Sequence, residues 1–170
     1  MLRIVLTGPE STGKTTLARE VARALGAPWS PEYARTHAET KVGALDASDV
    51  EPIALGQMRS EDDASARASG IVIHDTDLVS TVVYARHYYG ACPRWIEERA
   101  RSRVAALYLL PDLAIPFVPD GVRDVAAVRS VLFDAFSAEL ARLDARVVSL
   151  AGPLEGRTEA ALAAIDVLRR

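Results

Sequence analysis

Nine consecutive residues near the N-terminus have the types and spacing that bind phosphate groups. They are Gly8, Pro9, Glu10, Ser11, Thr12, Gly13, Lys14, Thr15 and Thr16, and they fit the pattern G-x-x-x-x-G-K-[ST] of a phosphate-binding loop, or P-loop. In such a loop the backbone N–H groups wrap the β-phosphate of a nucleotide, and the lysine reaches the β- and γ-phosphates. The hydroxyl at the Thr15 position binds Mg²⁺. We therefore expect residues 8–16 to bind ATP with Mg²⁺.

Amino-acid usage singles out the lysine of this loop. The chain has 20 Lys and Arg residues, and only Lys14 and Lys41 among them are lysines. A compact ammonium and a guanidinium are not interchangeable beside a phosphate. The alternative, a chance match on a strand, turn and helix, leaves the retention of Lys14 without an explanation.

Two aspartates follow a strongly apolar run at residues 71–73. Asp75 comes directly after the expected strand, where a P-loop protein needs a carboxylate near its metal. We expect Asp75 to hold the metal through water and to contact the substrate. Asp77, two residues on, can orient an acceptor hydroxyl or take its proton. The alternative is that both side chains only cap the helix that starts at Leu78.

A second polar group follows the short segment 27–31. Glu32 can bind sugar hydroxyls, Tyr33 can cover a ring, and Arg35 completes the group. Trp29 and Tyr88 are the aromatic residues that we add to this acceptor side, since an aromatic face attracts a cationic ring. The alternative is that Glu32 and Arg35 form a surface ion pair, which contributes little to stability.

Three arginines are candidates for contacts with the nucleotide. Arg123 ends the run Pro119-Asp120-Gly121-Val122-Arg123 on a proline-rich stretch, and Arg129 lies six residues later. Arginines on a closing loop can neutralise charge on a transferred phosphoryl group and exclude water, so both are catalytic candidates. Arg157 follows the glycine-containing stretch 152–156, which we expect near the nucleotide base. The alternatives are a solvated helix start for the first two and an ordinary loop for the third.

Strands and helices must alternate to bring these groups together. We expect strands at 1–7, 27–31, 71–73, 104–110 and 146–150. We expect six helices: from the P-loop to residue 25, from 48 or 49 to about 69, from 78 to 89, from 93 to about 101, from 124 to 143 and from 158 to 168. In the second of these, Ile53, Leu55, Met58 and Ala66 are expected to face the core. This order predicts one α/β domain over residues 1–170, a five-stranded parallel sheet flanked by helices. Ligands then bind at the carboxyl ends of the strands.

Composition limits the partners. Of the 170 residues 49% are apolar, enough for one core, and the net charge of −3 with a pI near 5.6 gives no electrostatic footprint for nucleic acid. We expect no membrane span, no signal peptide and a cytoplasmic location. Cys92 is the only cysteine, so we expect neither an internal disulfide nor a cysteine cluster for zinc. Composition leaves the oligomeric state open.

The motifs together resemble a known family. In order along nearly the whole chain, the run Gly8–Thr15, Glu32-Tyr33-Ala34-Arg35, Asp75-Thr76-Asp77 and Asp120-Gly121-Val122-Arg123 are similar to the NadR-type ribosylnicotinamide kinase domain, among the P-loop small-molecule kinases and AAA-like ATPases. The resemblance implies a nucleoside- or nucleotide-kinase-like fold with an arginine-bearing lid. It also implies ATP-dependent phosphorylation of the 5′-hydroxyl of nicotinamide riboside, a step of NAD salvage.

Three other functions compete with this expectation. A kinase for another small acceptor, such as a nucleoside, a nucleotide or a metabolite, has the same P-loop, because acceptor choice depends on the shape of the pocket. A regulatory GTPase needs an Asn-Lys-x-Asp motif, and this chain contains no asparagine. An ATP-driven remodeller needs a helical lid and oligomeric arginine fingers, for which 170 residues leave no room.

Overall fold

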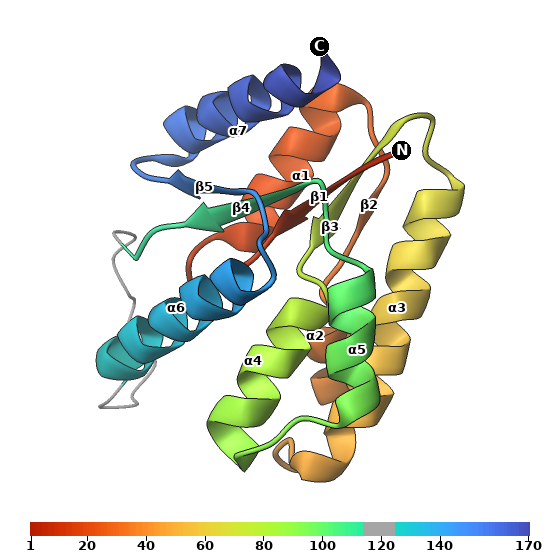
Figure 1. The fold of residues 1–170 in the computed structure, drawn as a ribbon, viewed down its shortest axis with the longest axis vertical. Helices are drawn as coiled ribbons and strands as arrows, with labels where there is room; N and C mark the ends of the chain where they lie inside the picture. The colour runs from red at the N-terminus through yellow and green to blue at the C-terminus, as the bar shows by residue number, and fades with distance from the viewer. Residues whose placement is uncertain (114–124) are drawn as a thin grey trace.

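A computed structural model describes residues 1–113 and 125–170, with the side chains of Val125 and Ala126 left out. Five parallel strands form one sheet in the order β2-β3-β1-β4-β5. The strands are β1 (Leu2–Leu6), β2 (Trp29–Ser30), β3 (Ile71–Asp75), β4 (Leu107–Pro111) and β5 (Val147–Leu150). The helices are α1 (Lys14–Leu25), α2 (Tyr33–Thr40), a 3₁₀ turn η1 (Ala47–Asp49), α3 (Val50–Ala66), α4 (Leu78–Tyr89), α5 (Arg94–Ser102), α6 (Val125–Arg142) and α7 (Leu154–Arg169). The expected α/β fold is confirmed (Figure 1).

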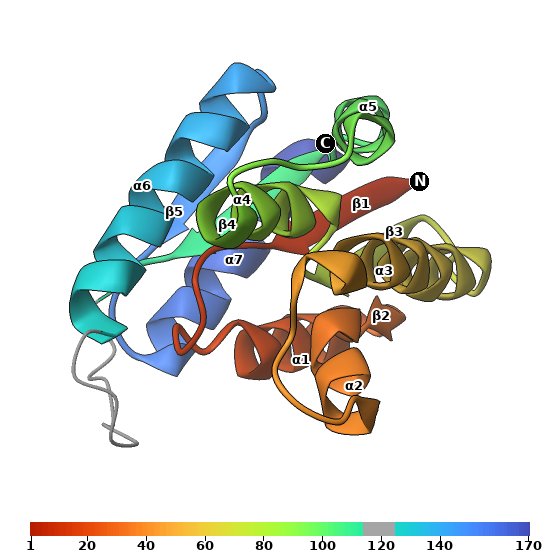
Figure 2. The same ribbon diagram turned by 90° about the horizontal axis from the view of Figure 1, so that it is seen from below.

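Helices cover both faces of the sheet, because successive side chains of a strand point to opposite faces. Figure 2 shows α1 and α7 on one side, and α4 and α6 on the other. Ile4 and Leu6 of β1 pack with α1 and α7, whereas Val5 packs with α4 and α6. A third cluster joins α3, α4 and α5 beside the sheet. Both sheet faces are apolar and buried, as expected for a parallel sheet.

The register of β1 and β3 places the two main motifs side by side. Leu6 pairs with Asp75, so the P-loop and the residues after β3 leave the sheet at the same edge. The N–H of Thr76 donates to the carbonyl of Leu6 over 2.9 Å and fixes that alignment. The chemistry expected at the strand ends therefore lies between two neighbouring strands.

The last expected helix differs from the structure at its start. The last helix begins at Leu154, four residues before Thr158, and the Thr158 hydroxyl donates to the Leu154 carbonyl instead of capping a helix start. Arg157 therefore belongs to the first turn of α7 and not to the preceding loop.

The core face of α3 also differs from the expectation. Leu55 is 41% exposed and Ala66 is exposed, while small and polar residues face inward. The buried positions of α3 are Val50, Ala54, Gly56, Gln57, Glu61 and Ala64. Ile53 and Met58 are partly buried, and Met58 packs against the cluster of α3, α4 and α5, so the expected face is wrong at Leu55 and Ala66 only.

Candidate nucleotide and acceptor sites

The P-loop has the backbone geometry of an anion cradle. Gly8, Ser11 and Gly13 have φ values of 122°, 57° and 77°. Such left-handed turns aim successive N–H groups inward, toward a phosphate at the start of α1. A Cβ at Gly8 would lie 2.9 Å from Cδ1 of Leu110 in β4, so this position has no room for a side chain.

Lys14 is folded back over its own loop. Its ammonium donates to the carbonyl of Pro9 over 2.6 Å, and the residue is only 8% exposed. Burial lowers the pKa of Lys14 from its usual value, and the carboxylates of Glu32 and Asp75 oppose that shift. The amine is thus held at the cradle beside acidic groups.

Asp75 lies beside Thr15, where the expected metal site requires it. The Thr15 hydroxyl donates to Oδ2 of Asp75 over 2.6 Å, while Oδ1 is buried without a hydrogen-bond partner. Burial raises the pKa of this carboxyl. These hard oxygens fit Mg²⁺, which prefers one or two protein ligands together with substrate phosphates and waters. Within residues 1–113 and 125–170, no three His, Cys, Asp or Glu side chains form a metal cage of their own.

Asp77 caps α4 and faces the core. One carboxylate oxygen accepts from the N–H of Val79 over 3.0 Å, and the other accepts from the Tyr108 hydroxyl over 2.8 Å. The residue is 3% exposed and does not line the acceptor cavity described below. This geometry matches the capping alternative for Asp77, whereas the metal and substrate roles of Asp75 stay predictions.

Two buried arginines hold the outside of the P-loop. Arg129 of α6 donates to the carbonyl of Ser11 over 3.3 Å, and Arg157 of α7 donates to the carbonyl of Thr12 over 3.0 Å. Arg157 also pairs with Asp112, after β4, over 2.7 Å. Arg123 and the run Pro119–Arg123, on which the expected lid depends, lie outside the described residues.

A small hollow borders the start of α1. It measures about 210 Å³ and lies between α1 and the start of α7. Its lining residues are Gly13, Thr16, Leu17, Gly152, Pro153, Leu154 and Arg157. This hollow lies where the sequence places the nucleotide base, next to the phosphate cradle.

A larger cavity of about 530 Å³ opens on the other side of the P-loop. It lies between α2, η1, α3 and α4, with Glu10 of the P-loop and Thr76 after β3 at its border. Four carboxylates and three tyrosines are among its lining: Glu10, Glu32, Asp46, Asp49, Tyr84, Tyr88 and Tyr89. Among the described residues that line it, none is lysine, arginine or histidine. The cavity therefore favours a ligand that is neutral or positively charged.

The expected acceptor residues are only partly gathered in this cavity. Glu32 and Tyr88 line it. Tyr33 instead packs against α3 at Gly56, and Arg35 is a largely exposed partner of Glu32 at 3.8 Å. Trp29 lies beneath the guanidinium of Arg19, whose central carbon is 5.1 Å from the centre of the Trp29 ring. Trp29 is not among the residues that line the cavity. Burial raises the pKa of the Glu32 carboxyl, and the Lys14 ammonium opposes the shift.

Other residues of the cavity were not expected from the sequence. Gln57 accepts from the N–H of Tyr33 over 2.9 Å and donates to the Thr76 carbonyl over 3.2 Å, joining α2 and α3 to the end of β3. Asp46 and Asp49 bind the Lys41 ammonium at the outer rim. An isolated glutamine or surface aspartate gives no sequence signal. Asp49 is the N-cap residue of α3, within the expected start at 48 or 49, and Asp46 caps the preceding η1 turn.

Comparison with known proteins agrees with this architecture. The family model AAA_28, described as an AAA domain, matches residues 3–157. The trifunctional NAD biosynthesis/regulator protein NadR of Salmonella typhimurium is 29% identical over 128 residues, which are 73% of this chain and 31% of that protein. The chain thus spans about a third of that relative's length.

Solved structures extend the similarity over nearly the whole chain. NadR in complex with NR has a TM-score of 0.75 and 29% identity, covering 96% of this chain and 50% of that one. NadR in complex with NAD and AMP-PNP has a TM-score of 0.72 and 28% identity, covering 96% and 48%. Thymidylate kinase from Ehrlichia chaffeensis, at 15% identity, has a TM-score of 0.69 and covers 98% of both chains, which shows the shared fold. In the described part of this chain, no helix has the length and apolar character to cross a membrane.

Proposed function

The chain belongs to the AAA_28 family of AAA domains, and on that premise we propose that it is an ATP-dependent kinase for the 5′-hydroxyl of nicotinamide riboside. Its fold is that of the P-loop small-molecule kinases. The structure of NadR with NR supports the acceptor, and the structure of NadR with AMP-PNP supports the donor. The product is nicotinamide mononucleotide, an intermediate of NAD salvage.

The cavity beside the P-loop is the single observation that carries the acceptor assignment. Its carboxylates and tyrosines suit a pyridinium ring, which carries a fixed positive charge. A nucleoside monophosphate would bring about two negative charges into the same space, where no described lining residue is a cation to receive them. A nucleotide-kinase function is therefore disfavoured, although such kinases share the fold.

The residues divide the reaction between the two sites. The P-loop N–H groups and Lys14 bind the phosphates of ATP, and the 5′-oxygen attacks the γ-phosphorus as the bond to the bridging oxygen of ADP breaks. Glu32, which lines the cavity and has a raised pKa, accepts the hydroxyl proton. Thr15 and Asp75 would hold Mg²⁺, which would supply positive charge to neutralise the outer phosphates. Arg129 and Arg123 are our candidates for charge on the transferred group.

Two alternative functions can be distinguished from this proposal by measuring activity with a panel of acceptors. A kinase for another small acceptor would use the same P-loop with a different preference in the cavity. An ATPase without an acceptor would hydrolyse ATP at a rate that no nucleoside changes.

An acceptor panel tests the proposal. Purified protein with ATP and Mg²⁺ is given nicotinamide riboside, adenosine, thymidine, uridine or thymidine monophosphate, and ADP formation and phosphorylated products are measured. We expect the highest kcat/KM for nicotinamide riboside. A tenfold preference for any other acceptor, roughly 1.4 kcal/mol in the transition state, contradicts the assignment.

The matched control is a Lys14→Ala variant. It should bind the nucleoside and lose nearly all turnover, because the ammonium that reaches the γ-phosphate is gone. Normal turnover in a folded Lys14→Ala protein would show that the activity comes from a contaminant or from another site.

A further inference from the structure

Glu10 brings a carboxylate into the phosphate-binding loop, where it would repel a nucleotide phosphate at short range. In the structure its side chain does not enter the cradle. Oε2 accepts a hydrogen bond of 2.7 Å from the hydroxyl of Tyr84 in α4. Both residues line the 530 Å³ cavity on the acceptor side of the loop.

Tyr84 is well placed to fix this carboxylate. Its ring stacks on Tyr88 with a centroid distance of 6.1 Å and an interplanar angle of 7°. The ring also meets the edge of the buried Phe136 at 5.6 Å and 81°. Packing on both neighbours limits the motion of the Tyr84 hydroxyl, so Glu10 is held between the phosphate cradle and the tyrosine wall of the cavity.

The four carboxylates of the cavity are not equivalent. Asp46 and Asp49 share the Lys41 ammonium, and His37 also contacts Asp49 over 2.8 Å, so their charge is compensated within the protein. The Lys41 ammonium lowers the pKa of Asp46 to about 2. By contrast, Tyr84, a neutral donor, supplies the hydrogen bond that the structure gives to Glu10. No ion pair within the described residues involves Glu10, so its carboxylate is not shared with an internal cation as those of Asp46 and Asp49 are.

We propose that Glu10, although part of the phosphate-binding loop, belongs to the acceptor site and selects nucleosides whose base carries a fixed positive charge. The inference rests on the proposed kinase function and adds the residue that sets its substrate class. Glu10 acts with Glu32 on the ligand side of the P-loop, while Tyr84 is a positioning residue that holds Glu10. Neutral nucleosides gain nothing from this charge, and phosphorylated ones are repelled.

A pair of nearly isosteric acceptors tests the role of charge. Nicotinamide riboside has a cationic ring, and its 1,4-dihydro form has the same ribose and carboxamide with a neutral ring. We measure kcat/KM for both acceptors with the wild type, Glu10→Gln, Tyr84→Phe and Glu51→Gln. Glu51 is exposed at the start of α3 outside the cavity lining, and its variant controls for the loss of one negative charge.

The expected result is a change in preference rather than a general loss. Glu10→Gln should lower the ratio of cationic to neutral kcat/KM about five- to tenfold, chiefly through KM, while KM for ATP stays within about twofold. Tyr84→Phe keeps the ring and should lower the ratio by a smaller factor, which gives a second test if Glu10→Gln does not fold. Glu51→Gln should leave the ratio unchanged.

Failure of this inference is distinct from failure of the proposed function. Suppose that the wild type phosphorylates nicotinamide riboside. If Glu10→Gln then leaves the ratio of cationic to neutral kcat/KM unchanged, because neither value falls or both fall equally, Glu10 does not select for charge. A selective rise of KM for ATP in Glu10→Gln would instead place Glu10 in the nucleotide site. If the wild type does not use nicotinamide riboside, the proposed function itself is wrong.

Discussion

At Asp75 a single carboxylate joins the proposed metal site to the sheet. Asp75 is the last residue of β3. One of its carboxylate oxygens accepts a hydrogen bond from the Thr15 hydroxyl, and the other is buried without a hydrogen-bond partner. The sequence could predict this residue, because a polar side chain directly after a buried parallel strand lies at the ligand edge of the sheet. The role of Asp77 two residues later was not decided by the sequence, since a cap and an acid have the same residue type.

Asp75→Asn is expected to separate chemistry from binding. The amide has nearly the same shape and keeps the Thr15 contact, but it loses the charge that attracts a divalent cation. We expect kcat to fall by at least about 100-fold, with KM for ATP within about threefold, measured in steady-state assays over a range of Mg²⁺ concentrations. Asp63→Asn, at an exposed position of α3, is the control. Equal losses in kcat and in ATP affinity would contradict the metal role.

At the scale of elements, the contact between α2 and α3 forms one side of the 530 Å³ cavity that we assign to the acceptor. Gly56 of α3 faces the ring of Tyr33, and a Cβ built at Gly56 would lie 2.0 Å from Cε1 of that ring. Glu32 and Ala34, on either side of Tyr33, line the cavity. The sequence did not reveal this contact, because the periodicity of apolar residues points to Leu55, which is exposed. Small residues at a close helix contact give no hydrophobic signal.

Gly56→Ala should therefore damage the acceptor site more than the nucleotide site. The added methyl must displace Tyr33, at a cost of about 1–3 kcal/mol for overpacking. We expect a lower midpoint of urea unfolding and a several-fold rise in KM for the acceptor, with KM for ATP little changed. Gly156→Ala is the matched control: no atom lies within 4 Å of its Cβ in α7, so it should stabilise the protein by about 0.5–1 kcal/mol. An equally stable Gly56→Ala protein with normal kinetics would refute the packing argument.

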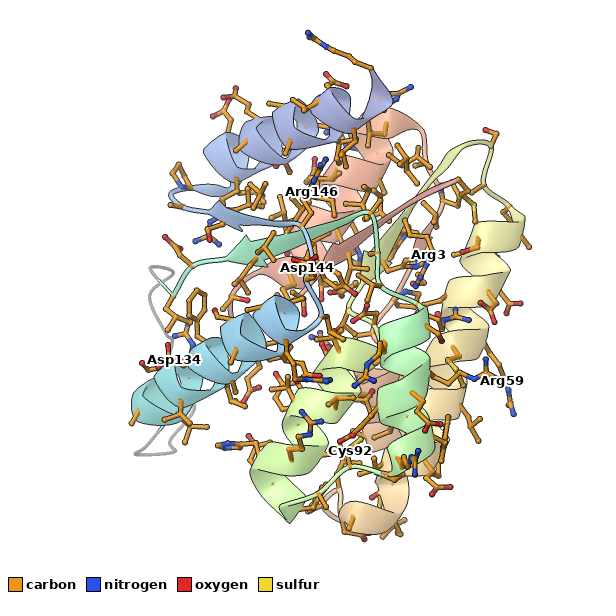
Figure 3. The ribbon with its side chains drawn as sticks, viewed as in Figure 1. Arg3, Arg59, Cys92, Asp134, Asp144 and Arg146 are labelled. Atoms are coloured by element: carbon orange, nitrogen blue, oxygen red, sulfur yellow. The ribbon has the colours of Figure 1, made fainter. Side chains whose placement is uncertain are left out.

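For the whole molecule, the alternation of apolar strands and amphipathic helices was enough to predict a parallel sheet with helices on both faces. The strand order was not predictable, because alternation does not say on which side of β1 each later strand is placed. The sequence also did not reveal a polar layer formed by Arg3, Glu61, His74 and Arg103, of which Glu61 and His74 are buried. Arg3 of β1, which is labelled in Figure 3, pairs with Glu61 of α3 over 2.8 Å, and Arg103 pairs with Glu61 over 3.2 Å. Such pairs depend on contacts between residues far apart in the chain.

This polar layer makes stability depend on pH in two opposing ways. His74 in β3 is fully buried, with Nδ1 2.8 Å from the Ser30 hydroxyl, and burial and then the charges of Arg3 and Arg103 lower its pKa to about 3. The folded protein keeps His74 neutral while the unfolded chain takes up a proton below about pH 6.5, so this contribution to stability is lost as the pH falls. Burial, and then the charge of Asp77, raises the pKa of Glu61. The folded protein therefore keeps the Glu61 proton to a higher pH than the unfolded chain does, and the contribution of Glu61 to stability is lost as the pH rises.

Replacing either His74 or Glu61 should leave, of the two opposing contributions, only the pH dependence of stability that the other residue causes. In His74→Gln, the unfolding free energy at pH 6.5 minus that at pH 5.0 should be smaller than in the wild type by about 1–2 kcal/mol, because up to about 1.4 kcal/mol per pH unit is lost with the histidine. Glu61→Gln should change the same difference in the opposite direction. Urea titrations at the two pH values give both quantities, and the exposed His87→Gln is the control. Because each variant is compared with itself at two pH values, a general loss of stability cancels. A His74→Gln difference equal to that of the wild type would mean that His74 takes up its proton in the folded state, and that the polar layer is open to water.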